Sequence, residues 1–269
     1  MFETRSLNRG DCRMVYDRRV VPGAPAVVLL HGYGVDRSMW GPTLPALEGY
    51  TVFNVDLRGH GDSRPCARFS IPLAAEDIHA LLAAEGVDRP VLAGLSMGGY
   101  VAQEYAWRYG GAAGYWLTGT TPVLLDCYAG WERWTLEHST PMLRPFPWGF
   151  LKGWMSRASS STAEGRRAVR AMFDRLSREE FLRGWDGVAH CLHPEVGFRF
   201  DAPVLVTRGE YDRLGSIRRY MGQWERAYPG ARALTIPGAS HVANLDAPEE
   251  FNRLLRGFVE QCMEARACG

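Results

Sequence analysis

The sequence contains no long hydrophobic run. A membrane-spanning helix needs about 18 or more consecutive apolar residues, and no stretch of the 269 residues reaches that length. The first residues, 1–5, carry an acidic side chain at Glu3 and do not lead into the apolar segment that a signal peptide requires. We therefore expect a cytoplasmic protein with no membrane partner.

The sequence also lacks an excess of either charge. It has 31 Lys and Arg residues against 30 Asp and Glu residues, for a formal net charge of +1. These charges are dispersed along the chain, whereas nucleic-acid-binding proteins concentrate basic residues in a patch or stripe. We expect a small-molecule substrate and no nucleic acid as partner, and the sequence leaves the oligomeric state open.

Cysteine and histidine spacings of the metal-binding type are missing as well. The cysteines include no C-x-x-C pair, so we expect free thiols rather than a disulfide framework or a zinc site. They are Cys12, Cys66, Cys127, Cys191, Cys262 and Cys268. His190 and His193 are too few to hold a metal alone, and we expect neither a metal nor an organic cofactor.

Short apolar runs alternate with helical patterns along most of the chain, which is typical of a parallel sheet covered by helices. An antiparallel hairpin is expected first, over 2–7 and 13–18. The expected strands that follow are 26–30, 50–55, 91–94, 115–118, 203–207 and 233–236. The expected helices are 38–47, 72–85, 97–109, 217–228 and 248–265.

Residues 122–200 interrupt this alternation, because they contain helical patterns and no strand pattern. They hold five of the nine tryptophans. A helical insertion between two strands of a parallel sheet lies above the carboxyl ends of the strands, where such sheets bind ligands. We predict a lid with an apolar inner wall, and the candidates that line the pocket are Tyr33, Trp131, Trp134, Trp154 and Val242.

Ser96 lies in the pentapeptide Gly94-Leu95-Ser96-Met97-Gly98, which matches the pattern G-x-S-x-G at a strand-to-helix turn. The turn forces the serine into a strained conformation, and glycines at 94 and 98 remove the Cβ atoms that would collide there. We predict that Ser96 is a nucleophile. The alternative is an ordinary serine in a glycine-rich turn.

A serine nucleophile needs a base and an acid that orients the base. His241 follows the expected strand 233–236, and Asp212 follows 203–207. Both therefore lie at the carboxyl edge of the sheet, in the chain order Ser, Asp, His. The alternatives are a helix N-cap for Asp212 and a loop histidine for His241, with Asp126 as the substitute acid.

An oxyanion hole completes this chemistry. Residues 30–34 follow the first parallel strand and include two glycines, which allow backbone N–H groups to turn toward Ser96. We predict that the amides of Tyr33 and Met97 are the donors. Met97 also begins a helix, whose dipole favours negative charge.

Five blocks of sequence carry a family resemblance. They are HGYGVDRSMW (31–40), DLRGHGDS (56–63), GLSMGG (94–99), GEYDRL (209–214) and GASHVANLDAPEEF (238–251). The chain resembles the α/β-hydrolase superfamily over nearly its full length, and most of all its esterase, enol-lactonase and C–C hydrolase group. The family uses the block 56–63 as a turn, so we interpret it as structural.

The resemblance implies an α/β fold with an eight-stranded, mostly parallel sheet, helices on both faces and a helical cap after the sixth strand. The core would comprise 1–121 and 201–269, and the cap 122–200. The resemblance also implies Ser96 as nucleophile, Asp212 as acid and His241 as base. Such chains often have a proline shortly after the acid, whereas this one has Leu214-Gly215-Ser216, which keeps Asp126 open as the acid.

The expected function is a serine hydrolase that cleaves a small hydrophobic or aromatic ester, lactone or thioester through an acyl-enzyme. Alternatives that would use the same three residues are a C–C bond hydrolase and a biosynthetic lyase, cyclase or acyltransferase. An alternative of another class is a small-molecule receptor that does not turn over its ligand.

Overall fold

The computed structural model describes residues 1–194 and 198–267, and these form an eight-stranded sheet with the order β1-β2-β4-β3-β5-β6-β7-β8. The predicted eight-stranded, mostly parallel sheet is confirmed. β1 pairs with β2, and β2 with β4, in antiparallel fashion, and every other pairing is parallel. The strands are β1 (Glu3–Asn8), β2 (Arg13–Arg19), β3 (Ala26–Leu30), β4 (Thr51–Asp56), β5 (Val91–Leu95), β6 (Gly114–Thr118), β7 (Val204–Gly209) and β8 (Arg232–Ile236).

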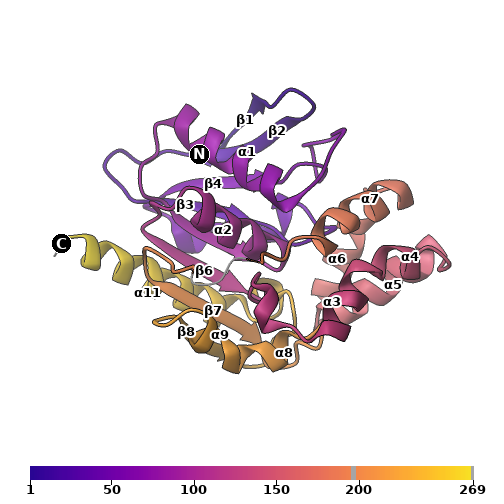
Figure 1. Ribbon diagram of the computed structural model, residues 1–269. Coiled ribbons are helices and arrows are strands. Elements are labelled where there is room, and N and C mark those ends of the chain that lie inside the picture. The colour runs from indigo at the N-terminus through magenta and orange to yellow at the C-terminus, as the bar shows by residue number, and fades with distance from the viewer. Residues whose placement is uncertain (195–197, 268–269) are drawn as a thin grey trace.

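Helices cover both faces of the sheet, as predicted. Figure 1 shows α1 (Ile71–Glu85) and α2 (Met97–Arg108) on the nearer face and α11 (Pro248–Ala267) on the other. The ring of Trp116 on β6 packs edge-on against Phe251 and Phe258 of α11. The central strands are therefore covered on two sides and must be apolar throughout.

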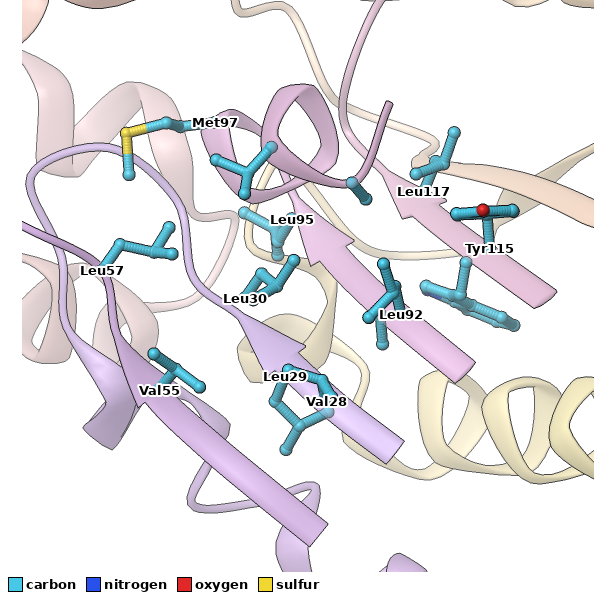
Figure 2. Packing of buried hydrophobic residues seen from close by; sticks show 14 of the residues in the cluster. Val28, Leu29, Leu30, Val55, Leu57, Leu92, Leu95, Met97, Tyr115 and Leu117 are labelled. Atoms are coloured by element: carbon cyan, nitrogen blue, oxygen red, sulfur yellow. The ribbon is translucent and has the colours of Figure 1, made fainter. Parts of the chain in front are cut away.

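The core lies along these central strands. All residues of β4, β5 and β6 are buried, and Figure 2 shows Leu30, Leu92 and Leu117 on three neighbouring parallel strands. Burial of one such side chain contributes about 1.5–3 kcal/mol. The ends of these strands therefore form a fixed platform for the loops that follow them.

Two predicted helices are broken. Residues 38–47 form two 3-10 turns, η1 (Arg37–Trp40) and η2 (Leu44–Leu47), because Pro42 and Pro45 cannot continue a helix from the preceding turn. Residues 217–228 form α8 (Ile217–Tyr220), η4 (Met221–Gln223) and α9 (Trp224–Ala227), with the helix-weakening Gly222 in the middle.

In the described part of the chain between β6 and β7 there are five α-helices, and Figure 1 shows them grouped beyond one end of the sheet. We call them the cap. They are α3 (Gly130–Glu137), α4 (Ser139–Leu143), α5 (Trp148–Ser159), α6 (Ala163–Asp174) and α7 (Arg178–Ala189). An isolated parallel bridge between Leu124 and His193 joins the chain entering the cap to the chain leaving it. The domain boundaries 122 and 200 and the function as a lid stay predictions.

The expectation of free thiols is wrong for Cys12 and Cys66, which form a disulfide. The two residues pair as an isolated antiparallel bridge 54 residues apart in sequence, a proximity that cysteine spacing does not reveal. Cys127, Cys191 and Cys262 are free, and Cys268 lies outside the described residues. Within 1–194 and 198–267, no helix combines the length and apolarity needed to cross a bilayer.

Candidate active site

Ser96 stands at the junction of β5 and α2. Its backbone has φ +55° and ψ −113°, a left-handed conformation that non-glycine residues rarely adopt and that costs of order 1–3 kcal/mol. The Ser96 N–H donates to the carbonyl of Thr118 at the end of β6 (2.8 Å). The sharp turn predicted from the sequence is therefore present, and it is held by the neighbouring strand.

The two glycines that flank Ser96 allow this turn. A Cβ atom at Gly94 would lie 2.3 Å from the carbonyl oxygen of Gly98, and one at Gly98 would lie 2.1 Å from that of Leu30. Both distances are far below van der Waals contact, so neither position accepts a side chain without movement of the backbone. This is the steric reason that the sequence suggests for both glycines.

His241 and Asp212 form a hydrogen-bonded pair. The imidazole Nδ1 lies 3.0 Å from Asp212 Oδ2, and the aspartate is fully buried while the histidine side chain is 9% exposed. When Nδ1–H donates to a carboxylate, the neutral imidazole keeps Nε2 as an acceptor. The pair therefore presents a base oriented by an acid.

The end of β6 brings this pair and Ser96 together. Gly119 follows β6, and a Cβ atom there would lie 3.1 Å from His241 Nδ1 and 3.4 Å from Asp212 Oδ2. The preceding residue, Thr118, accepts the hydrogen bond from Ser96 N–H. The three predicted residues thus meet around Thr118 and Gly119, although their catalytic roles stay predictions.

The substitute acid, Asp126, lies elsewhere. It is exposed on η3 (Leu125–Cys127), whereas His241 is hydrogen-bonded to Asp212. The structure also gives a reason for the absence of a proline shortly after Asp212. The N–H of Leu214 donates to Asp212 Oδ1 (3.0 Å). A proline at 214 would remove that donor.

The loop after β3 lies against Ser96. A Cβ atom at Gly32 would be 3.5 Å from Ser96 Cβ, and Tyr33 follows directly. Met97 starts α2 and is fully buried, and Figure 2 shows it beyond the end of β5. The backbones of Tyr33 and Met97 therefore belong to two segments that meet at the serine, and their role as oxyanion donors stays a prediction.

The side chain of Tyr33 connects this loop to the cap. Its hydroxyl donates to the carbonyl of Phe181 on α7, and its ring centroid lies 5.1 Å from that of Phe181 and 5.5 Å from that of Trp185. Burial raises the pKa of the Tyr33 phenol well above its ordinary value of 10, which keeps the hydroxyl a donor. The sequence predicts pocket lining for this residue but not its contact with α7.

Two histidines lie at the loop after β3: the structural role of His31 was not predicted from the sequence, whereas His60 belongs to the block 56–63 that we interpret as structural. His31 donates Nδ1–H to the carbonyl of Gly32 (2.7 Å), and its Nε2 accepts the N–H of Leu57 (2.9 Å). Burial lowers the pKa of His31 to about 4 and that of His60 to about 3. Both rings are therefore neutral, and their centroids lie 5.2 Å apart. They shape the loop that carries Tyr33.

The remaining pocket candidates differ in exposure. The side chains of Trp131, Trp134 and Trp154 are 65%, 54% and 48% exposed, so much of each indole faces solvent. Val242 is buried, and its N–H donates to the carbonyl of Ser159 (2.9 Å). Pocket lining by these four residues stays a prediction.

The two histidines considered for a metal site contact different partners. His190 caps α7 and its Nδ1 bonds the carbonyl of Asp186 (2.8 Å), while His193 lies beyond the helix and contacts Glu104. Among the described residues no group of three or more His, Cys, Asp or Glu side chains has the arrangement of a metal site. The expectation of a cofactor-free site stays a prediction.

Comparison with known proteins agrees with this architecture. Residues 27–254 match the model of a family described as the alpha/beta hydrolase family, and this match spans most of the chain. The chain belongs to the α/β hydrolase family. As a member of that family it is a hydrolase, and the predicted family resemblance is confirmed.

Relatives and solved structures cover nearly the whole length. The chain is 24% identical over 241 residues to 3-oxoadipate enol-lactonase 1 of Acinetobacter baylyi, with 88% of this chain and 89% of the relative covered. It is 27% identical over 258 residues to pimeloyl-[acyl-carrier protein] methyl ester esterase of Aeromonas hydrophila, with coverage of 87% and 95%. A thermophilic esterase from Thermogutta terrifontis has a similar fold, with a TM-score of 0.81, 22% identity and coverage of 97% and 99%.

Proposed function

We propose that this hydrolase cleaves a small hydrophobic or aromatic ester, lactone or thioester through an acyl-enzyme on Ser96. The observation that carries the proposal is the 3.0 Å hydrogen bond between His241 Nδ1 and Asp212 Oδ2, placed beside the strained serine turn. Two relatives that match 88% and 87% of this chain are an enol-lactonase and a methyl ester esterase, and these names indicate hydrolysis of a lactone and of an ester.

In the acylation step, His241 Nε2 takes the proton of the Ser96 hydroxyl while Oγ attacks the acyl carbon. Asp212 accepts the hydrogen bond from Nδ1–H and stabilises the imidazolium that forms. The tetrahedral intermediate collapses, the bond to the leaving group breaks, and the leaving group departs with the proton from His241. Water then attacks the acyl-enzyme by the reverse proton path and releases the acid.

Negative charge on the tetrahedral oxygen is stabilised by the N–H groups of Tyr33 and Met97. The proximity of Gly32 to the Ser96 Cβ supports this assignment, as does the position of Met97 in the first turn of α2. Removal of one such donor costs about 3–4 kcal/mol of transition-state stabilisation.

The preference for an apolar acyl or leaving group rests on the cap. Phe181 and Trp185 of α7 contact the ring of Tyr33, so aromatic surface lies next to the loop that holds the proposed oxyanion donor. Pockets for small molecules combine such apolar walls with a few polar groups that orient the reacting bond.

The test is covalent labelling with a fluorophosphonate, followed by peptide mapping, together with hydrolysis of chromogenic esters of graded chain length. After digestion with trypsin, we expect a single phosphonylated serine, Ser96, in the peptide that comprises residues 69–108. The Ser96→Ala variant should lose labelling and lose kcat by roughly 10⁴- to 10⁶-fold. Labelling at another serine, or full turnover by Ser96→Ala, would contradict the proposal.

Product analysis separates the alternatives that share these residues. Cleavage of vinylogous diketones without ester hydrolysis would indicate a C–C bond hydrolase, and products that contain no water-derived oxygen would indicate a lyase, cyclase or acyltransferase. Stoichiometric modification of Ser96 without turnover would indicate a receptor.

A further inference from the structure

Helix α6 of the cap contacts two loops of the core. One carries His241 and comprises residues 238–246, including the short helix α10 (Ala243–Asp246), and we call it the histidine loop. The other is the oxyanion loop, residues 31–36, which carries Tyr33. We infer that α6 sets the relative placement of these two loops, with Asp246 and Arg175 as positioning residues at its two ends. The inference rests on the proposed function and adds to it a means by which the cap assembles the site.

Asp246 joins the histidine loop to the start of α6. Its Oδ2 accepts the N–H of Ser240, the residue before His241 (2.8 Å), and also the N–H of Ser161 in the cap (2.9 Å). Its Oδ1 accepts the hydroxyl of Ser160 (2.5 Å). A single carboxylate therefore links the backbone next to the proposed base with the segment that leads into α6.

The carboxylate of Asp246 also contacts the N-cap residue of α6. Thr162 is the N-cap of α6, and its Oγ1 both accepts the N–H of Gly165 (3.0 Å) and donates to Asp246 Oδ1 (3.2 Å). A Cβ atom at Gly165 would lie 3.0 Å from Asp246 Oδ1, so the first turn of α6 packs directly on the aspartate.

Further hydrogen bonds hold the histidine loop on both sides of His241. The N–H of Val242 donates to the carbonyl of Ser159 (2.9 Å). The hydroxyl of Ser161 donates to the carbonyl of Gly238 (2.9 Å). The loop that positions the proposed base is thus bonded to the segment between α5 and α6.

The other end of α6 contacts the oxyanion loop. Arg175, its C-cap, donates from Nη1 to Asp36 (2.6 Å) and from Nη2 to Asp62 (2.6 Å). Asp36 is buried and accepts the N–H of Ser38, so it is fixed within the core. The guanidinium therefore joins the end of α6 to a residue three positions after Tyr33.

Close packing reinforces this contact. A Cβ atom at Gly34 would lie 2.1 Å from Cε1 of Phe173 in the last turn of α6, and Gly34 has φ +75°. The aromatic ring therefore rests on the backbone of the oxyanion loop at a position where only glycine fits. The 12-residue helix, about 18 Å long at 1.5 Å per residue, spans the distance between the two loops.

A rigid helix fixed at both ends sets the spacing between the base and the oxyanion donor. Misplacement of a reacting group by about 1 Å costs on the order of 10²-fold in rate. Release of either end should therefore slow the chemistry even though Asp246 and Arg175 belong to neither the proposed triad nor the oxyanion hole.

The first test measures the rate of fluorophosphonate labelling of Ser96 and the Tm of single variants of the full chain. We expect Asp246→Ala to slow labelling by on the order of 10- to 100-fold. Asp246→Asn should recover most of the rate, because its amide oxygen can accept both backbone N–H groups while its amide nitrogen donates to Ser160 and Thr162. Ser70→Ala, which removes the N-cap of α1, lowers Tm without contact with α6 and should label at the parental rate.

The second test concerns the coupling of the two ends. Arg175→Ala should slow labelling, and Arg175→Lys should recover part of the rate. In the double variant Asp246→Ala, Arg175→Ala the loss should be smaller than the product of the two single losses, because release of either end of α6 already removes the fixed spacing between the two loops.

The outcomes separate this inference from the proposed function. Parental labelling rates in Asp246→Ala and Arg175→Ala would overturn the inference and leave the proposed function intact. The same holds if Ser70→Ala loses as much labelling rate for a given fall in Tm as these two variants do. Losses that multiply independently would overturn the role of α6 as one connecting element. If the unaltered protein fails to label at Ser96, the proposed function and this inference both fall.

Discussion

The cap leaves more of its large aromatic residues exposed than the core does. Three tryptophans of the core, Trp40, Trp116 and Trp224, are fully buried, and the fourth, Trp107, is 37% exposed. The cap leaves large apolar side chains in solvent, and these are Trp131, Trp134, Met142, Phe146, Phe150 and Trp154. Large apolar residues therefore stabilise the core, whereas several of them on the cap are exposed and available for contact with other molecules.

Under the proposed function, the core carries out the chemical step and the cap selects the substrate. Ser96 and Asp212 follow the buried strands β5 and β7, and His241 follows the edge strand β8, whose last residue is buried, so their relative positions depend on the sheet. The cap meets that platform through a limited set of contacts, such as Arg175 with Asp36. Substitutions in the core loops should change the rate of the chemical step, and substitutions on the cap surface should change which substrate is accepted.

The largest expected effect lies in the core. Replacement of Asp212 by Asn keeps the shape of the side chain but removes the carboxylate that accepts Nδ1–H of His241, so the imidazole is no longer held in the productive tautomer. We expect a loss of roughly 10⁴-fold in kcat with little change in Tm, measured by steady-state hydrolysis of a chromogenic ester and by thermal unfolding.

Asp126→Asn is the matched control, since Asp126 is exposed on η3. It should retain parental kcat. A large loss in Asp126→Asn together with near-parental activity in Asp212→Asn would show that the acid is Asp126.

An intermediate effect is expected from pH. Burial lowers the pKa of His31 to about 4 and of His60 to about 3, whereas both titrate near 6.5 in the unfolded chain. Between these values the unfolded chain binds protons that the native core does not, so the free energy of unfolding falls as the pH drops from about 6.5 toward 4. This stability is fully present above about pH 6.5, and the loss at low pH is at most about 3 kcal/mol for His31 and about 5 kcal/mol for His60.

Denaturant unfolding across this pH range measures the effect. His60→Gln should flatten the pH dependence, and His138→Gln, which alters an exposed cap histidine, should leave it unchanged. Stability that does not vary between about pH 7 and pH 4.5 would contradict the neutral, buried state of the two core rings.

The smallest effect is expected on the cap surface. Trp154 is 48% exposed, so Trp154→Ala should change the free energy of unfolding by less than about 1 kcal/mol. Phe181→Ala, which empties a buried position in the same cap, should cost about 3–5 kcal/mol.

The kinetics of Trp154→Ala test its predicted place in the pocket. A rise in KM for aromatic esters with unchanged kcat would support contact between the indole and the substrate. An unchanged KM for esters of every chain length would remove Trp154 from the pocket.

The central strands β3 and β5 were predictable because each is a continuous run without polar residues. The runs at 26–30 and 91–95 are buried on both faces, and no polar residue interrupts them. The helix predicted over 38–47 failed for a local reason, since Pro42 and Pro45 break it into two turns. The order of Ser96, Asp212 and His241 along the chain was readable because each follows a recognisable strand.

Contacts between distant loops were not predictable. Nothing near Asp246 in the sequence indicates that its partners lie 84 to 86 residues earlier, in the cap. The disulfide between Cys12 and Cys66 and the contact of Tyr33 with α7 are of the same kind. These contacts depend on how the cap and loops pack on the finished sheet, which no single stretch of sequence encodes.

Trapping the acyl-enzyme tests the central claim most directly. The protein would be mixed with p-nitrophenyl acetate, quenched in acid during the first turnover, and digested for mass spectrometry. The account predicts one acetyl group per chain, attached to Ser96, and a much slower appearance of that group in Asp212→Asn. Hydrolysis that proceeds with no acetyl group on Ser96 at any time during turnover would contradict it.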